Sequence, residues 1–223
     1  MNAFTCIGKG HSAPAIPATR KEWEELRKQP WLADMCRRIE QGDEKLKGRL
    51  PIWTPRCAEF KDNHRAIKDA VKTLRRAVMD VDDKGHSQEI LSRLQPLMAE
   101  GRWEVLLVEE SVRRGTHIIL TIPQGMSIEE VQQRFSEDIG YKVDSSTKDL
   151  YMVPDDHTLY VNERLFEEET DNDNRLVINE KFTDPLPIAN HSTLITQRSN
   201  TYPSDYKGIP YDILVEALTE QLG

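Results

Sequence analysis

The sequence lacks any apolar run of about 18 residues, the length that a membrane-spanning helix needs. It also lacks the charged and then apolar N-terminal segment that marks a secreted protein. Its three cysteines, Cys6, Cys36 and Cys57, lie far apart and form no CxxC pair, so neither a disulfide framework nor a zinc knuckle is indicated. There is no internal repeat and no P-loop. From these absences we expect a cytoplasmic protein with no membrane partner and with reduced cysteines in its core.

Charge is present in quantity, but it is unevenly distributed. Of the 223 residues, 38% are hydrophobic, which is enough for one good core with appendages or for two small domains. The net charge of −8 is the sum of +6 over residues 1–80 (17 basic, 11 acidic) and −14 over residues 81–223 (13 basic, 27 acidic). If a polyanion binds, the first third is the expected surface, because phosphate contacts need clustered cations. Two oppositely charged segments that simply help each other to pack would give the same distribution.

The stretch from Val78 to Asp82 is the strongest candidate for a functional site. Its apolar and β-branched residues predict a strand, and the turn-forming residues 83–85 follow it. Asp80 and Asp82 then point to the same side, because side chains alternate along a strand. Two neighbouring carboxylates repel each other, and a divalent cation removes that conflict. The same residues would also be found in a polar, Asp-rich turn at the end of an ordinary strand, without any bound metal.

The elements around this stretch are expected in the order β-α-β-β-α-β. In chain order, they are a strand at 78–82, a helix capped at Ser87, a strand at 105–108, a strand at 116–122, a helix capped at Ser127 and a final strand within 141–153. This order is typical of the ferredoxin-like split βαβ unit, an antiparallel sheet with two helices on one face. The expected fold class is therefore α+β.

The chain divides into three regions by its sequence patterns. These are a helical region at 1–50, the βαββαβ core at 51–165, and an acidic linker with a C-terminal helix at 166–223. In the first region, Thr19 and Glu22 form a capping-box pattern, and Pro30 suits the first turn of a second helix. In the third region, an acidic run at 167–174 precedes an amphipathic helix near 213–222. We expect that helix to pack on this chain or on a following domain.

Further polar side chains are expected beside the two aspartates. In the split βαβ topology the first and third strands are neighbours, and the fourth flanks the first. If the aliphatic face of the third strand packs on the helices, His117 lies on the open face with Asp80 and Asp82, and Asp144 arrives beside them. Three carboxylates can hold two Mg²⁺ or Mn²⁺ ions, which activate a hydroxyl and stabilise a leaving pyrophosphate. This predicts phosphoryl chemistry at the sheet.

A short hairpin loop before His117 supplies cations and a glycine. The candidates for binding the triphosphate of an incoming nucleotide lie in this loop or near it: Ser111, Arg113, Arg114, Gly115, His117 and, as a weaker candidate, Lys148. Each residue also has a plainer interpretation. A single histidine on a strand is usually a satisfied polar residue, and two adjacent arginines can form a solvated hairpin tip.

Taken together, these residues resemble the three motifs of the archaeo-eukaryotic primase-polymerase superfamily. The motifs are a hydrophobic strand with DxD (78–82), a small residue two positions before a histidine (115–117) and a third aspartate (143–144), and they occur in the family's order. The chain is more closely similar to the primase-like, VirE N-terminal domains of bacterial mobile-element proteins. That likeness is carried by residues 50–51, 110–117, 144–149, 159–162 and 206–211.

The resemblance covers roughly residues 50–165 and has definite implications. It implies a metal-dependent nucleotidyltransferase that joins NTPs or dNTPs on a DNA template during mobile-element replication, with Mg²⁺ or Mn²⁺ as cofactor. Asp80, Asp82 and Asp144 would bind the metals, and His117 would hold the phosphates. Such domains often precede a helicase-type ATPase; with no P-loop in this chain, that activity would belong to a partner or to a further domain.

The chain departs from the family at one position that matters for the chemistry. Many relatives carry an arginine before the last strand, where this chain has Leu150-Tyr151-Met152. Part of the usual phosphate contact is therefore absent, unless Arg113 or Arg114 replaces it. This departure favours an alternative function, a non-catalytic replication-initiator or DNA-binding module with a degenerate primase fold. A metal-dependent nuclease that uses the same carboxylates is a third possibility.

Overall fold

A computed structural model describes residues 3–10, 13–144, 149–167, 205–206 and 209–210 of the chain. These residues form a mixed α+β structure in which the strands pair in antiparallel sheets. Lys148, most of the predicted acidic run and the predicted C-terminal helix lie outside the described residues. Within those ranges, no helix has the length and apolar character needed to cross a membrane.

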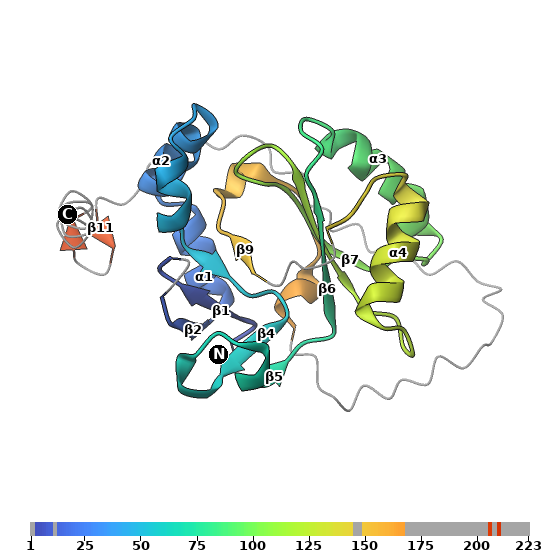
Figure 1. Ribbon diagram of the computed structural model, residues 1–223, viewed down its shortest axis with the longest axis horizontal. Helices are drawn as coiled ribbons and strands as arrows, with labels where there is room; N and C mark the ends of the chain where they lie inside the picture. The colour runs from blue at the N-terminus through green and yellow to red at the C-terminus, as the bar shows by residue number, and fades with distance from the viewer. Residues whose placement is uncertain (1–2, 11–12, 145–148, 168–204, 207–208, 211–223) are drawn as a thin grey trace.

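A four-stranded sheet, which we call the central sheet, lies in the middle of the molecule (Figure 1). Its strands, in spatial order, are β10 (Thr158–Val161), β7 (Val105–Glu110), β8 (Thr116–Thr121) and β6 (Arg76–Val81). Asp144 forms an isolated antiparallel bridge with Asp80, and its backbone N–H donates to the Asp80 carbonyl at 2.8 Å. Among the described residues, Asp144 is therefore the point at which the chain returns beside β6.

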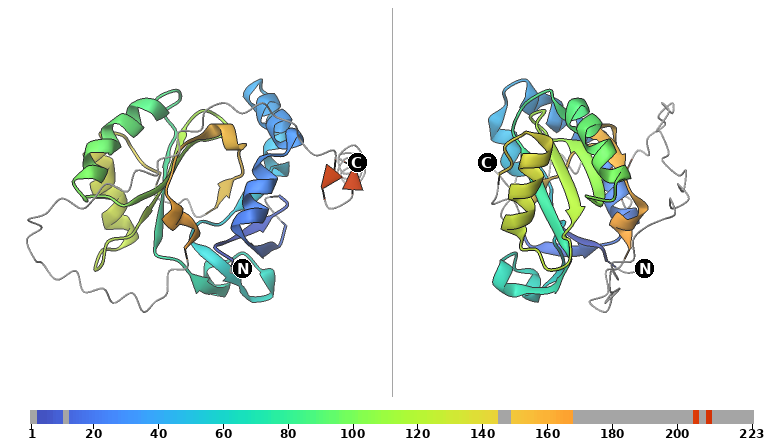
Figure 2. Two further views of the ribbon diagram at one scale, coloured as in Figure 1. Left: turned by 180° about the vertical axis from the view of Figure 1, so that it is seen from behind. Right: turned by 90° about the vertical axis from the view of Figure 1, so that its right-hand side faces the viewer.

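Two helices, α3 (Ser87–Ala99) and α4 (Ile128–Ile139), cover one face of the central sheet (Figures 1 and 2). The predicted alternation along the strands is confirmed on this face. Side chains of β6 and β8 pack with α3 and α4 in one buried apolar cluster, which includes Met79, Val81, Ile118, Leu120, Ile90, Leu94, Val131 and Phe135. Asp80 and His117 consequently lie on the opposite face.

The sequence predicted that the opposite face is open, but the structure shows that it is covered. Residues 3–10 and 13–53, which we call the N-terminal layer, lie over it together with β9 (Figure 1). The layer contains α1 (Arg20–Arg27), α2 (Pro30–Glu40) and a second sheet in the order β2 (Ala15–Ala18), β1 (Thr5–Gly8), β3 (Ile52–Trp53) and β9 (Leu150–Tyr151). The region that was predicted to be helical therefore also contributes strands.

The second apolar cluster fills the space between the N-terminal layer and the central sheet. Trp23, Leu32 and Trp53 of the layer pack with Val78 and Ile119 of the sheet, and all five are buried. Because the central sheet buries apolar side chains on both faces, any polar group on its covered face needs a partner inside the protein.

Helix ends follow the predicted capping with one exception. Thr19 caps α1 in a capping box, Ser127 caps α4 in the same way, and Gly140 ends α4 in the left-handed conformation. The prediction that Ser87 caps α3 was wrong. The cap position is His86, and the Ser87 hydroxyl is instead 2.8 Å from the Thr116 hydroxyl of β8.

The predicted last strand lies within 141–153, as expected, but it belongs to a different sheet. Of the described residues in this segment, Asp144 pairs with β6, while Leu150 and Tyr151 pair with β3 in the second sheet. The physical reason is burial, because Leu150, Met152 and Val153 belong to the apolar cluster under the N-terminal layer. The far edge of the central sheet is formed by β10, which pairs with β7.

The remaining elements are short. They are the hairpin of β4 (Cys57–Phe60) with β5 (Ala70–Thr73), the pair β11 (Asp205–Tyr206) and β12 (Ile209–Pro210), and the 3₁₀ helices η1 (Glu44–Arg49), η2 (Lys61–Asn63), η3 (Ile67–Asp69), η4 (Asp155–His157) and η5 (Glu163–Phe166).

Arg76, the first residue of β6, joins three distant segments. Its side chain is buried, and Nη1 donates to the carbonyl oxygens of Phe4 (3.1 Å) and Pro55 (3.3 Å). Nη2 donates to the carbonyl oxygen of Leu165 at 3.0 Å. A buried guanidinium without such acceptors would cost several kcal/mol. These carbonyls therefore make the buried charge tolerable and tie both ends of the described fold to β6.

Candidate active site

The three predicted aspartates lie at the edge of β6. Asp80 is on the covered face with its side chain 24% exposed, Asp144 forms the bridge to it, and Asp82 follows the strand at the surface. Burial raises the pKa of Asp80, and the charges of Asp82 and Asp144 raise it further, whereas His117 and Lys47 act against this. The edge therefore carries an excess of negative charge at neutral pH.

The chemistry of these groups fits a divalent cation, since carboxylate oxygens are the ligands that Mg²⁺ and Mn²⁺ prefer. A cation would also relieve the repulsion that raises the pKa of Asp80. In the part of the chain that the structure describes, no group of three or more His, Cys, Asp or Glu side chains is arranged to hold a metal ion. Asp82 and Asp144 would have to turn toward Asp80 for a three-carboxylate site to form.

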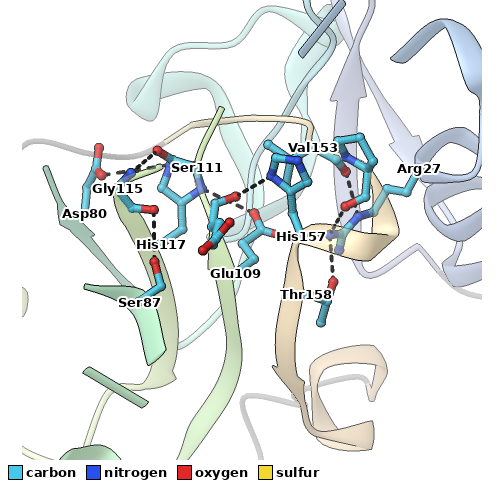
Figure 3. A network of polar contacts seen from close by, with 12 residues as sticks. Arg27, Asp80, Ser87, Glu109, Ser111, Gly115, His117, Val153, His157 and Thr158 are labelled. Atoms are coloured by element: carbon cyan, nitrogen blue, oxygen red, sulfur yellow. Dashed lines mark hydrogen bonds and ion pairs between the residues drawn. The ribbon is translucent and has the colours of Figure 1, made fainter. Parts of the chain in front are cut away.

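His117 lies directly beside Asp80, because the two residues are paired in the register of β8 and β6. Its imidazole is almost fully buried, with Nε2 3.9 Å from Asp80 Oδ1 and Nδ1 3.3 Å from Glu109 Oε1 (Figure 3). An ionised carboxylate can only accept a hydrogen bond, so Nδ1 carries the proton in that contact. The ring is thereby oriented with Nε2 toward Asp80.

Glu109, the neighbour of His117 across β7 and β8, is itself buried and paired with a cation. Its Oε2 is 2.9 Å from Arg27 Nη2 of α1, and the two side chains are 1% and 2% exposed. Burial alone would raise the pKa of Glu109, but Arg27 and His117 outweigh it, and the pKa lies below its ordinary value. Glu109 is therefore ionised at neutral pH and can hold both neighbours.

Arg27 is fixed by contacts with the segment after β9. Its Nε donates to the carbonyl oxygen of Val153 at 2.9 Å, and its Nη2 donates to the Pro154 carbonyl and the Thr158 hydroxyl at 3.1 and 2.8 Å (Figure 3). The ring of Trp23 lies 4.2 Å from the guanidinium carbon. Burial lowers the pKa of Arg27, and Glu109 offsets part of that effect. We call Arg27, Glu109, His117 and Asp80 the charge network.

Arg27 and Glu109 were not among the residues predicted from the sequence. A signal for Arg27 was present, because it follows Trp23 by four positions and therefore lies on the same, buried side of α1. Glu109 continues the apolar run of β7 and is as buried as the residues before it. In both elements, the signal was a charged residue within an apolar pattern. Nothing in the sequence indicated, however, that Arg27 and Glu109 form a pair.

The predicted phosphate-binding loop is held by its own serine. Ser111 Oγ accepts hydrogen bonds from the backbone N–H groups of Gly115 (3.0 Å) and Arg113 (3.4 Å), and the Ser111 N–H donates to the Gly115 carbonyl. A Cβ at position 115 would lie 2.7 Å from the Val81 carbonyl oxygen, so only glycine lets the loop approach the end of β6 this closely. Ser111 and Gly115 therefore shape the loop beside His117.

The two arginines of the loop contact the N-terminal layer. Arg113 forms an ion pair with Glu44 of η1, and Arg114 forms ion pairs with Glu40 of α2 and Glu110 of β7. Both guanidinium groups are about half exposed, and exposed ion pairs contribute at most about 1 kcal/mol. These arginines can therefore exchange a carboxylate for a phosphate at little cost.

Tyr151, the residue at the departure from the primase-polymerase pattern, carries a cation on its ring. Lys47 Nζ of η1 lies 5.2 Å from the centre of the Tyr151 ring, and its charge lowers the pKa of Asp80. Lys47 is a candidate that the sequence did not indicate, since it lies about a hundred residues before Tyr151. It brings a positive charge to the acidic edge from the N-terminal layer.

In comparisons with known proteins, no family model, no curated protein and no solved structure matches this chain. We therefore infer a function from the residues and from their arrangement.

Proposed function

We propose that this protein is a DNA primase-polymerase-type nucleotidyltransferase that joins NTPs or dNTPs on a DNA template with Mg²⁺ or Mn²⁺, in the cytoplasm and in the replication of a mobile element. The observation that supports it best is the charge network, in which a buried arginine and a buried glutamate orient one histidine toward Asp80. Even when they are paired, buried ionic groups seldom stabilise a fold more than apolar residues would, so a site of this kind suggests a role in function.

The arrangement of the strands agrees with the proposed family. Asp144, β6, β8 and β7 lie side by side in that order, with α3 and α4 on one face. We propose that this unit is a ferredoxin-like βαββαβ core whose fourth strand is represented, among the described residues, by the bridge at Asp144. The covering N-terminal layer would then be part of the catalytic unit, because it supplies Arg27 and Lys47.

In this proposal each side chain has a distinct task. Asp80, Asp82 and Asp144 would hold the divalent ions, which when bound polarise phosphoryl oxygens and lower the pKa of an attacking hydroxyl. Glu109 keeps the His117 ring in one orientation, so that Nε2 faces the space beside Asp80. Lys47, Arg113 and Arg114 are placed around this edge and can neutralise the phosphates of a nucleotide.

Two assignments extend beyond the described residues. Lys148 remains a proposed phosphate contact, since it belongs to the segment between Asp144 and β9. A helicase-type ATPase domain or protein remains the proposed partner, since the sequence has no P-loop of its own. Both follow from the resemblance to the primase-like domains of mobile-element proteins.

The test is nucleotide incorporation on single-stranded and primed DNA templates with Mg²⁺ or Mn²⁺. The wild type is compared with Asp80→Ala and His117→Ala, and with Asp83→Ala and His64→Ala as controls that change exposed residues of the same types. We expect incorporation to disappear in the first two variants and to persist in the controls, with all five proteins folded by circular dichroism. Incorporation that survives in Asp80→Ala would contradict the proposal.

A second candidate is a DNA-binding module that has lost its chemistry. It is favoured by Tyr151 in place of the expected arginine and by the acidic net charge of −8. A folded wild type that binds DNA but incorporates no nucleotide would support this module. Cleavage of DNA that requires Asp80, without incorporation, would instead indicate a metal-dependent nuclease.

A further inference from the structure

A second polar site lies at the opposite end of β6 from Asp82. The β4–β5 hairpin, with Thr54 and Arg56 before it and Asp149 just before β9, lines a partly open cavity of about 60 Å³. Its polar lining consists of Thr54, Arg56, Arg65, Thr73 and Asp149, and its apolar lining includes Phe60 and Ala70. The cavity therefore brings two arginines together with a single carboxylate.

The charges in this cavity are not balanced. Arg65 Nε is 3.1 Å from Asp149 Oδ2, and the two side chains are 13% and 18% exposed. Arg56 forms no ion pair with any residue that the structure describes, although it is only partly exposed. Burial lowers the pKa of Arg56, and Glu129 offsets only part of that effect. The lining thus has one positive charge in excess, on a partly desolvated guanidinium.

The size and chemistry of the cavity suit one tetrahedral anion. The cavity volume of about 60 Å³ is several times the roughly 10–15 Å³ that one water molecule needs, so there is room for a small polyatomic anion. The planar fork of arginine matches phosphate oxygens in two simultaneous hydrogen bonds. The Thr54 hydroxyl is already used, since it donates to the Cys57 carbonyl at 2.8 Å. Arg56 is therefore the principal donor, with Arg65 beside it.

The position of the cavity connects it to β6. The Leu74 N–H donates to the Arg56 carbonyl at 2.9 Å, which places Arg56 next to the start of this strand. From Arg76 to Asp80 the strand extends over four residues, or about 13 Å. The cavity and the acidic edge at Asp80 therefore lie toward opposite ends of one strand.

We propose that this cavity binds one backbone phosphate of a nucleic acid strand that extends along β6 to the acidic edge at Asp80. The proposal rests on the proposed function for the identity of the strand, but the anion site itself rests only on Arg56, Arg65 and the cavity. It also accounts for a partly buried arginine that forms no ion pair with a carboxylate among the described residues.

The experiment uses inorganic phosphate as the first probe and the full chain as the protein. Phosphate binding is followed by NMR or calorimetry for the wild type, for Arg56→Gln and for Arg134→Gln. Arg134 is an exposed arginine of α4, so both variants lose one positive charge and only one of them changes the cavity. We expect at least tenfold weaker binding in Arg56→Gln and no change in Arg134→Gln. Equal binding by all three proteins, or none by the wild type, would overturn the anion site.

The second probe is a fluorescent single-stranded oligonucleotide, whose affinity is measured by anisotropy at fixed salt. Arg56→Gln is expected to weaken it about three- to tenfold, with a smaller salt dependence, while Arg134→Gln leaves it unchanged. Phosphate binding that is lost in Arg56→Gln without any change in DNA affinity would overturn the nucleic acid assignment. In that case the cavity would serve a free phosphate.

The phosphate- and DNA-binding results can be distinguished from the nucleotide-incorporation results that test the proposed function. Phosphate and DNA binding are measured without nucleotide incorporation, so the cavity can be confirmed even if the wild type proves to be catalytically inactive. Conversely, incorporation that depends on Asp80 but is indifferent to Arg56 would leave the proposed function intact and remove the cavity from it.

Discussion

The two faces of the central sheet are both buried, but they are buried by different means. On the face under α3 and α4, the cluster around Met79, Ile118 and Phe135 is apolar, and the buried polar residues beside it, Ser87, Thr116 and Gln132, are uncharged. On the face under the N-terminal layer, Val78 and Ile119 lie beside His117 and Glu109, which need Arg27 as a counter-ion. The first face is held by packing and the second by packing plus paired charges.

This difference separates what stabilises the fold from what prepares a site. An apolar face gains free energy from every side chain it buries. Paired buried charges at best break even against apolar residues of the same size. The charged groups around His117 therefore make the covered face less stable than apolar residues in their place would. The predictions below test this interpretation, from the largest expected effect on stability to the smallest.

Glu109→Ala should have the largest effect, because it leaves the buried charge of Arg27 without its carboxylate. We expect the free energy of unfolding to fall by about 3–5 kcal/mol, as for other broken buried pairs. Urea denaturation followed by circular dichroism measures this loss. The double variant Arg27→Met/Glu109→Gln should recover most of it, since the unpaired charge is gone.

The matched variant on the apolar face is Leu120→Ala, with an expected loss of about 2–5 kcal/mol from the cavity it creates. No second substitution of a charged residue should recover that loss. If the double variant on the covered face is no more stable than Glu109→Ala alone, the two faces do not differ in the way that we describe.

Acid should affect the two faces differently. The pKa of Glu109 is lowered in the folded protein, so its contribution to stability is complete above the ordinary carboxyl pKa of about 4.3 and is lost as the pH falls through the folded value. Glu109→Gln should therefore narrow the stability difference between pH 7 and pH 3, whereas Leu120→Ala should leave it unchanged. Melting temperatures measured across this range provide the test.

Asp80→Asn should increase stability. The pKa of Asp80 is raised by burial and by its acidic neighbours, so its ionised form costs free energy at neutral pH. We expect a gain of about 0.5–2 kcal/mol at pH 7, in the range of single stabilising substitutions, and a smaller gain at pH 4, where a larger fraction of the wild-type carboxyl is protonated. Loss of stability at pH 7 would argue that Asp80 is structural, and Asp83→Asn serves as the exposed control.

Lys47→Gln should change stability by less than about 0.5 kcal/mol, because Lys47 is only partly buried and contacts Tyr151 at the surface of the ring. Its effect should instead appear in nucleotide incorporation, with a reduction of about tenfold for one lost charged contact. Lys45→Gln, at an exposed position of the same η1, is the control. Equal activity of both variants would remove Lys47 from the site.

Much of the central sheet could be predicted because its pattern is local. Alternation along β6 and β8 assigned Met79 and Ile118 to the helices and Asp80 and His117 to the other face, and the structure confirms this. The caps of α1 and α4 were also correct, since a capping box lies within four residues. Local sequence determines these features, so local reasoning was sufficient.

The parts that were missed depend on contacts across long stretches of the chain. Glu109 and Arg27 are 82 positions apart, and β9 leaves the central sheet because its apolar residues are buried beside Trp53. No spacing rule connects such residues. The same holds for the ion pairs of Arg113 and Arg114, which could be read as a solvated tip until the N-terminal layer was placed beside them.

The hydrogen bonds of Arg76 have a consequence for the order in which the protein is completed in the cell. Leu165, one of its acceptors, is synthesised 89 residues later. At about 5–20 residues per second, the ribosome needs roughly 4–18 seconds to cover that distance. During this interval the N-terminal layer and β6 already exist, but the buried guanidinium lacks its last acceptor. The N-terminal layer should therefore pack fully on the central sheet only after β10 and η5 have emerged from the ribosome. Folding of the nascent chain then depends on η5, which contains Leu165.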